Sequence, residues 1–149
     1  MERTACTNTF LFPDINVWLA LSYPAHIHFE TAEAWFRAQN EEATFVFCRH
    51  TQLGFLRLMN NQAALREDTR NQRQCWELYD RWIGSGTAIF MEEPAGIEIG
   101  LRLRTASEFA SPKTWADAYL AAFAEAAGLT LVTFDRARAG KVSGSILLG

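Results

Sequence analysis

Short apolar runs alternate with longer amphipathic stretches along most of the chain. The short runs are rich in β-branched and aromatic residues, which is typical of buried strands. They predict strands at residues 10–13, 43–47, 87–90, 129–134 and 146–148. The longer stretches carry apolar residues at helical spacing and predict helices at residues 15–21, 28–39, 51–59, 71–83, 98–104 and 115–127. The longest loops are then predicted at residues 60–68 and 92–96.

Helices separate the predicted strands, and this order indicates an α/β fold with a central parallel β-sheet flanked by helices on both faces. No repeat or linker interrupts the pattern, so one domain is predicted over residues 1–149. Leu53, Leu56 and Met59 are spaced as a buried stripe on their helix. Four tryptophans are spaced for burial in the core or in an interface, namely Trp18, Trp35, Trp76 and Trp115. Because parallel sheets bind ligands beyond the carboxyl ends of their strands, residues that directly follow a strand are the candidate functional residues.

The composition is that of an ordinary globular protein. The chain has 149 residues and a net charge of −3, with 49% hydrophobic and 21% charged residues, which excludes disordered and collagen-like classes. No apolar run approaches the roughly 20 residues of a membrane helix. The first ten residues lack a signal peptide's apolar segment, which favours a cytoplasmic protein. Three widely spaced cysteines (Cys6, Cys48 and Cys75) argue against a disulfide framework or a zinc–cysteine site.

Three aspartates are the candidate catalytic residues. Asp14 and Asp135 each directly follow a predicted strand, and Asp117 lies in the first turn of a predicted helix. In a parallel sheet these carboxylates would meet at one edge and repel one another. A hard divalent cation such as Mg²⁺ would relieve that repulsion, because it prefers oxygen ligands. Such an ion polarises a phosphoryl oxygen and orients an attacking water, so the pattern predicts phosphodiester hydrolysis.

Each aspartate also has a purely structural interpretation. Asp14 fits a helix N-cap, Asp117 complements a helix dipole, and Asp135 fits a turn. It is the joint placement of the three that favours a metal site. Other chemistry has less support, because the histidines lack zinc-ligand spacing and no nucleophile elbow or phosphate-binding glycine loop is present.

Four segments together resemble the PIN-domain nucleases, and in particular the VapC-type toxins of toxin–antitoxin modules. They are Leu11 to Ala20 (LFPDINVWLA), Cys48 to Asn60 (CRHTQLGFLRLMN), Trp115 to Ala121 (WADAYLA) and Gly128 to Arg136 (GLTLVTFDR). Their order and spacing fit the family over nearly the whole chain. The resemblance implies a PIN-like fold and an endoribonuclease that uses Mg²⁺, with Mn²⁺ as a possible substitute.

The resemblance also assigns roles to individual residues. The family's three metal-binding catalytic aspartates match Asp14, Asp117 and Asp135. Asn16 and Thr133 match positions that often support the metal site through hydrogen bonds.

One position departs from the family pattern. The family usually has a glutamate in the helix that contains residues 51–60, but here the candidate positions hold the uncharged Gln52 and Gly54. Glutamine can still coordinate through its carbonyl oxygen or hold a metal-bound water. Three outcomes are open: the site works with three aspartates, another acid such as Glu98 or Glu125 replaces the glutamate, or the enzyme is impaired.

Basic residues near the predicted acidic edge are candidates for RNA binding. Arg57 and Arg136 are the two proposed phosphate contacts, and Arg138 and Lys141 extend the second group. Surface salt bridges or a solvated loop would account for the same residues. The chain contains twelve arginines and two lysines, a bias that phosphate binding or, more simply, a GC-rich genome would produce.

The resemblance implies a tRNA or rRNA substrate, a homodimer, and a cognate VapB-like antitoxin whose C-terminal segment covers the acidic site. Two other function classes share features with a nuclease of this kind. A PIN-fold domain that lost efficient catalysis would act mainly by binding RNA or antitoxin. A phosphoacceptor signalling domain also uses strand-end aspartates, but it would need adjacent acids at the first strand and a lysine after the last, which this sequence lacks.

Overall fold

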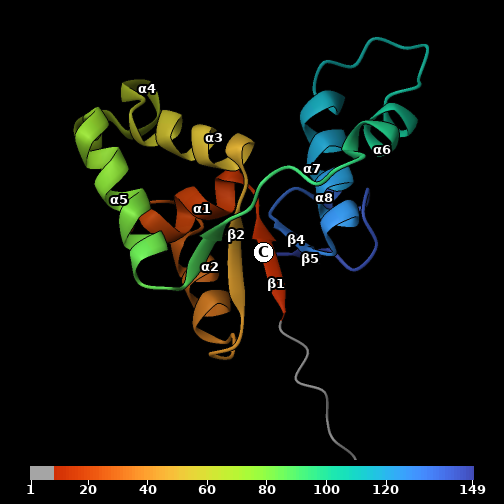
Figure 1. Cartoon of the computed structure of the whole chain (residues 1–149). Helices are drawn as coiled ribbons and strands as arrows, with labels where there is room; N and C mark the ends of the chain where they lie inside the picture. The colour runs from red at the N-terminus through yellow and green to blue at the C-terminus, as the bar shows by residue number, and fades with distance from the viewer. Residues whose placement is uncertain (1–8) are drawn as a thin grey trace, which may run out of the picture.

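The computed structural model describes residues 9–149. Within that range, five parallel strands form one sheet in the order β3-β2-β1-β4-β5 (Figure 1). The strands are β1 (Phe10–Pro13), β2 (Thr44–Phe47), β3 (Ala88–Phe90), β4 (Thr130–Thr133) and β5 (Ile146–Leu147). Each lies within a predicted strand, and the predicted α/β fold with a central parallel sheet is confirmed.

The helices in the described part of the chain are α1 (Ile15–Ser22), α2 (Phe29–Arg37), α3 (Arg49–Met59), α4 (Gln62–Leu65), α5 (Gln72–Gly84), α6 (Ile97–Arg104), α7 (Thr114–Ala127) and α8 (Arg136–Ala139). All of them except α4 and α8 match predicted helices within a few residues. The loop predicted at residues 60–68 is wrong in part, because it contains α4 and a 3-10 turn, η1 (Arg66–Asp68). Elements of three or four residues are too short to show an apolar period, so the sequence pattern misses them.

Helices cover both faces of the sheet, as predicted. Successive strand side chains point to opposite faces. Leu11, Phe47 and Val132 belong to a core cluster packed by α1, α2, α3 and α5. Their neighbours Phe12, Val46 and Leu131 belong to a second cluster packed by α6 and α7. Figure 1 shows these two groups of helices on either side of the strands.

Trp18 lies at the centre of the first cluster and confirms the prediction of a core tryptophan. Its side chain is fully buried, and its ring stacks on Phe47 with 3.8 Å between centroids. Trp82 packs edge-on against it at 5.2 Å. The indole Nε1 of Trp18 is the one buried side-chain nitrogen or oxygen within residues 9–149 without a hydrogen-bond partner. The ring is therefore held by packing, with no hydrogen bond from its nitrogen.

Three side chains predicted as possible core residues are instead exposed. Leu53 is 56% exposed, so the stripe predicted on α3 is wrong at that position. Trp76 and Trp115 are 47% and 61% exposed, so for them only the alternative of an interface remains. Helical spacing shows which residues share a face, but it does not show which face another element covers.

The carboxyl ends of β1 and β4 lie at the same edge of the sheet, and short polar contacts start a helix after each. Asp14 caps α1 by accepting the Val17 N–H at 3.0 Å. Asp135 caps α8 by accepting the Arg138 N–H at 3.0 Å. These caps fix both carboxylates at the edge where parallel sheets bind ligands.

None of the helices in residues 9–149 has the length and apolar character needed to span a membrane. Cys48 and Cys75 are buried free thiols. Cys6 lies outside the described residues, as does most of the segment considered for a signal peptide.

Candidate functional site

Asp14 is the most deeply buried carboxylate of the predicted site, with 1% of the residue exposed. Its Oδ1 atom accepts the Val17 N–H of α1. Its Oδ2 atom accepts the Thr133 hydroxyl at 2.5 Å and Nη1 of Arg138 at 2.8 Å. These three hydrogen-bond partners compensate for the burial of a charged group and fix its orientation.

Asp117 and Asp135 lie next to Asp14, as the sequence predicts for a shared edge. Asp117 is in the first turn of α7, and its Oδ1 accepts Nε of Arg138 at 2.7 Å. The Asp135 backbone N–H donates to the Thr133 hydroxyl at 2.9 Å, while its carboxylate caps α8. Asp14 and Asp117 therefore converge on one arginine, and Asp135 adjoins them through Thr133.

Two interpretations of Arg138 are open from the sequence, an RNA-facing basic cluster and a solvated loop, and the structure contradicts both. Its side chain is 17% exposed and bridges Asp14 and Asp117. Burial alone would lower the pKa of Arg138, but the charges and hydrogen bonds of these two carboxylates outweigh it and raise the pKa. One sequence signal was available: an arginine three residues after a strand-end aspartate falls in the first turn of any helix that the aspartate caps.

The residues at this edge fit a divalent cation in chemical kind. Asp14, Asp117 and Asp135 supply carboxylate oxygens, which hard cations prefer. Across residues 9–149, however, no group of three or more His, Cys, Asp or Glu side chains is arranged to hold a metal ion. The Arg138 guanidinium lies between Asp14 and Asp117, and the Asp135 carboxylate faces the start of α8. In this structure the cation between Asp14 and Asp117 is therefore the guanidinium of Arg138.

The Gln52 side chain, at a position where the family usually has a glutamate, is buried and bonds to another residue. Gln52 is 4% exposed, and its Oε1 accepts Nη1 of Arg49 at 2.5 Å. Burial raises the pKa of Tyr79, and a hydrogen bond from Gln52 lowers it by a smaller amount. An acid at position 54 would require the Ile15 side chain to move, because a Cβ there would lie 2.2 Å from Cδ1 of Ile15. Neither candidate position therefore supplies an acidic group, and Gln52 is bound to Arg49 instead.

The two acids considered as replacements for that glutamate are bound elsewhere. Glu125 forms an ion pair with Arg104, which joins α7 to α6. Glu98 forms an ion pair with Arg102 one turn along α6. Of the three outcomes left open by the sequence, the replacement of the glutamate by one of these acids finds no support, because each pairs with an arginine of α6.

The two predicted supporting residues behave differently. Thr133 is fully buried between Asp14 and Asp135, as described above. Asn16 is exposed on α1, and no hydrogen bond in residues 9–149 joins its side chain to the three aspartates. The structure thus brings Thr133, but not Asn16, into contact with the acidic residues.

Replacing Thr133 with valine should loosen this edge. Thr133→Val keeps the shape of the side chain but removes one hydrogen bond to Asp14 and one from the Asp135 N–H. We expect a loss of about 1–3 kcal/mol in the free energy of unfolding, because two buried polar groups lose a partner. Urea denaturation measures this, and Thr133→Ser is the control that keeps the hydroxyl. Equal stability of the valine and serine variants would contradict the assigned contacts.

Two basic residues proposed for RNA binding remain available to solvent. Arg57 and Arg136 are exposed, and neither forms an ion pair within residues 9–149. His50 lies near both Arg138 and Arg57. Burial lowers the pKa of His50 most, and the charges of these two arginines lower it further. Positive charge therefore borders the acidic edge.

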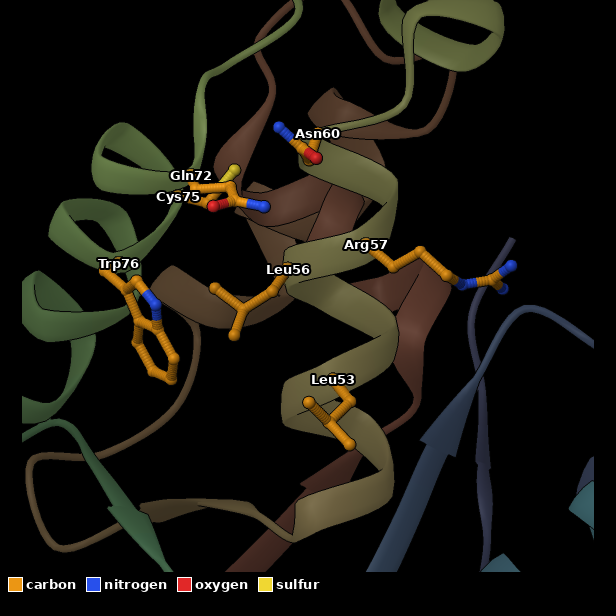
Figure 2. Close-up of a pocket in the computed structure, with 7 residues that line it drawn as sticks. All are labelled: Leu53, Leu56, Arg57, Asn60, Gln72, Cys75 and Trp76. Atoms are coloured by element: carbon orange, nitrogen blue, oxygen red, sulfur yellow. The ribbon is translucent and has the colours of Figure 1, made fainter.

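An apolar groove of about 370 Å³ lies between α3 and α5. Figure 2 shows Leu53, Leu56 and Trp76 facing the groove, with Cys75 and Gln72 at one end. The Arg57 side chain extends away from Trp76, on the other side of α3 (Figure 2). Helix α3 thus presents apolar groups on one side and a free guanidinium on the other.

Comparison with known proteins agrees with the geometry. The family model for the PIN domain matches residues 11–142. Ribonuclease VapC41 of Mycobacterium tuberculosis is 36% identical over 131 residues, which span 85% of this chain and 90% of that protein. Two solved structures share the fold. VapC20 of Mycobacterium tuberculosis, a Sarcin-Ricin loop cleaving toxin, has a TM-score of 0.61 at 14% identity and covers 83% of this chain and 87% of its own. VapBC2 of Rickettsia felis, bound to a promoter DNA fragment, has a TM-score of 0.60 at 15% identity. The match covers 93% of this chain and 97% of that structure's chain. The chain belongs to the PIN-domain family.

Proposed function

We propose that the chain is a metal-dependent endoribonuclease toxin that hydrolyses RNA phosphodiester bonds. One observation carries the proposal: Asp14 and Asp117, far apart in the sequence, converge on a single cationic group beyond the carboxyl end of the sheet, with Asp135 alongside. Structural stability does not favour three carboxylates at one edge, whereas binding of a cation does. The 36% identity to a ribonuclease over most of the chain supports RNA as the substrate.

Mg²⁺, or Mn²⁺ in its place, is the proposed cofactor, held by Asp14, Asp117 and Asp135. When bound, such an ion stabilises charge on a phosphoryl oxygen and lowers the pKa of the attacking water. The chain's own residues orient the ligands, since Thr133 and the start of α1 fix the Asp14 carboxylate. Arg57 and Arg136 are exposed near the edge and would bind phosphates that flank the cleaved bond.

The proposed partners follow from the family. The substrate is an RNA of the tRNA or rRNA class, which places the activity in the cytoplasm. A VapB-like antitoxin is the proposed inhibitor, and the apolar groove between α3 and α5 is available to an apolar segment of such a partner. We also propose a homodimer, for which the exposed Trp115, Ile99 and Leu103 offer an apolar surface.

A catalytically weakened PIN domain that binds RNA or antitoxin is the second candidate. It is favoured by one observation, the uncharged Gln52 bound to Arg49 where the family usually has a glutamate. Metal binding separates the two candidates, because a disabled site would show no saturable uptake of Mn²⁺.

The chemistry of the product ends tests the proposed reaction. Purified protein is incubated with total RNA and Mn²⁺, and the new ends are captured by ligation. Water attack leaves a 5′-phosphate and a 3′-hydroxyl, so we expect new 5′-phosphate ends. Products that end in 2′,3′-cyclic phosphate would contradict the proposal, because they arise when the RNA's own 2′-hydroxyl attacks.

A further inference from the structure

The acidic edge contains a buried cation of its own. The Arg138 guanidinium donates through Nη1 to Oδ2 of Asp14 at 2.8 Å and through Nε to Oδ1 of Asp117 at 2.7 Å. The side chains of the three residues are 17%, 1% and 14% exposed. The contact therefore differs from a surface ion pair, which solvent screens and which contributes little.

We propose that Arg138 is an intramolecular competitor of the catalytic metal, so that metal loading requires its guanidinium to release at least one of the two carboxylates. This inference rests on the proposed function, because it assumes that Asp14 and Asp117 are metal ligands. Arg138 is then a positioning residue: it holds the two carboxylates together and sets how tightly the site binds a cation.

The competition follows from the shared oxygens. Oδ2 of Asp14 already accepts two hydrogen bonds, from Thr133 and Arg138, and Oδ1 accepts the Val17 N–H. A hard cation needs lone pairs on the same carboxylates. A guanidinium and a divalent ion on the same carboxylate oxygens also repel each other strongly at this depth of burial. One of the two must yield.

The charge balance of the site points the same way. Asp14, Asp117 and Asp135 carry three negative charges, and Arg138 returns one positive charge. Gln52 adds none, although the family pattern has a glutamate there. With one acid fewer and one guanidinium more, the edge attracts a divalent ion less than a full set of acids would.

The position of Arg138 allows it to release the carboxylates without unfolding the sheet. It is the third residue of α8, a helix of four residues that begins at the Asp135 cap. The Arg138 backbone N–H bonds to the Asp135 carboxylate, so the backbone stays anchored when the side chain moves. Arginine's long side chain then gives the guanidinium access to solvent beyond the edge.

The test is Mn²⁺ binding to the full chain, measured by calorimetry with no RNA present. Arg138→Met removes the guanidinium and keeps much of the side-chain length. We expect it to bind Mn²⁺ about tenfold or more tightly than the parent protein, because the metal no longer displaces an ion pair. Arg81→Met, at an exposed arginine of α5 with no proposed role in the site, is the matched control and should leave the affinity unchanged.

A second measurement separates competition from a merely structural role. If Arg138→Met leaves Asp14 and Asp117 to repel each other, the variant should have a lower melting temperature than the parent without metal, and Mn²⁺ should raise it by more than it raises the parent's. Arg138→Gln serves the same purpose if the methionine variant does not fold.

Each outcome decides a specific statement. Equal or weaker Mn²⁺ binding by both Arg138 variants would overturn the competition while leaving the nuclease proposal intact. Tighter binding without RNA cleavage would support the competition and contradict the nuclease. If neither the parent nor the variants bound Mn²⁺, the competition and the metal-dependent function would both be overturned.

Discussion

Asp117→Asn should reduce RNA cleavage by about a thousandfold or more while the protein stays folded. The substitution removes one of three proposed metal-binding charges, and loss of charge at a metal centre acts on both metal affinity and the transition state. The side chain is 14% exposed, and the asparagine carbonyl can still accept the hydrogen bond from Nε of Arg138. The variant therefore keeps the hydrogen bond to Arg138 but loses the negative charge that a metal ion would bind. Initial rates of cleavage in Mn²⁺, alongside a thermal melt of each protein, measure both effects.

The matched control for this variant is Asp80→Asn on α5. Asp80 is exposed and lies on a helix that packs on the first core cluster, away from the acidic residues. Its cleavage rate should equal that of the parent. Near-normal cleavage by Asp117→Asn would remove Asp117 from the site and count heavily against the proposed metal centre.

Trp18→Ala should have the largest effect on stability in the chain. The substitution leaves a large cavity beneath Phe47 and Trp82, whose rings both pack on the indole. We expect a loss of about 3–5 kcal/mol in the free energy of unfolding, a large share of the 5–15 kcal/mol typical of a domain. Urea denaturation followed by circular dichroism measures it.

Two further variants check the cause of that loss. Phe109→Ala removes an aromatic ring that is 85% exposed, and its stability should stay within about 0.5 kcal/mol of the parent. Trp18→Phe keeps an aromatic ring and removes the buried Nε1–H that has no partner in the described part of the chain, so it should cost much less than alanine. A Trp18→Ala protein as stable as Phe109→Ala would show that Trp18 does not anchor the core.

The order of strands and helices could be predicted from the sequence because each long element shows its own apolar period. The same rule could not reveal α4, η1 and α8, which have only three or four residues each. It also placed Leu53 in the core, although that side of α3 faces an open groove. Periodicity identifies a helix face, but tertiary packing decides whether that face is buried.

For the candidate site, the sequence predicts where the aspartates meet but not where the Arg138 side chain points. The two strand-end aspartates and the aspartate at the start of α7 could be placed together because parallel strands bring their carboxyl ends to one edge. The direction of the Arg138 side chain could not, since it depends on the α8 cap and on two carboxylates 21 and 124 residues away in sequence. From sequence alone, a basic residue near an acidic edge suggests RNA binding, whereas the Arg138 side chain forms a buried ion pair.

The most direct test of the account is RNA cleavage by the purified, antitoxin-free chain in Mn²⁺, then in EDTA, then with Mn²⁺ restored in excess. If the acidic edge is a catalytic metal centre, cleavage should appear with the metal, stop with EDTA and return when the metal is added back. Cleavage that continues at the same rate in EDTA would contradict the account, because the three aspartates would then have no metal to hold.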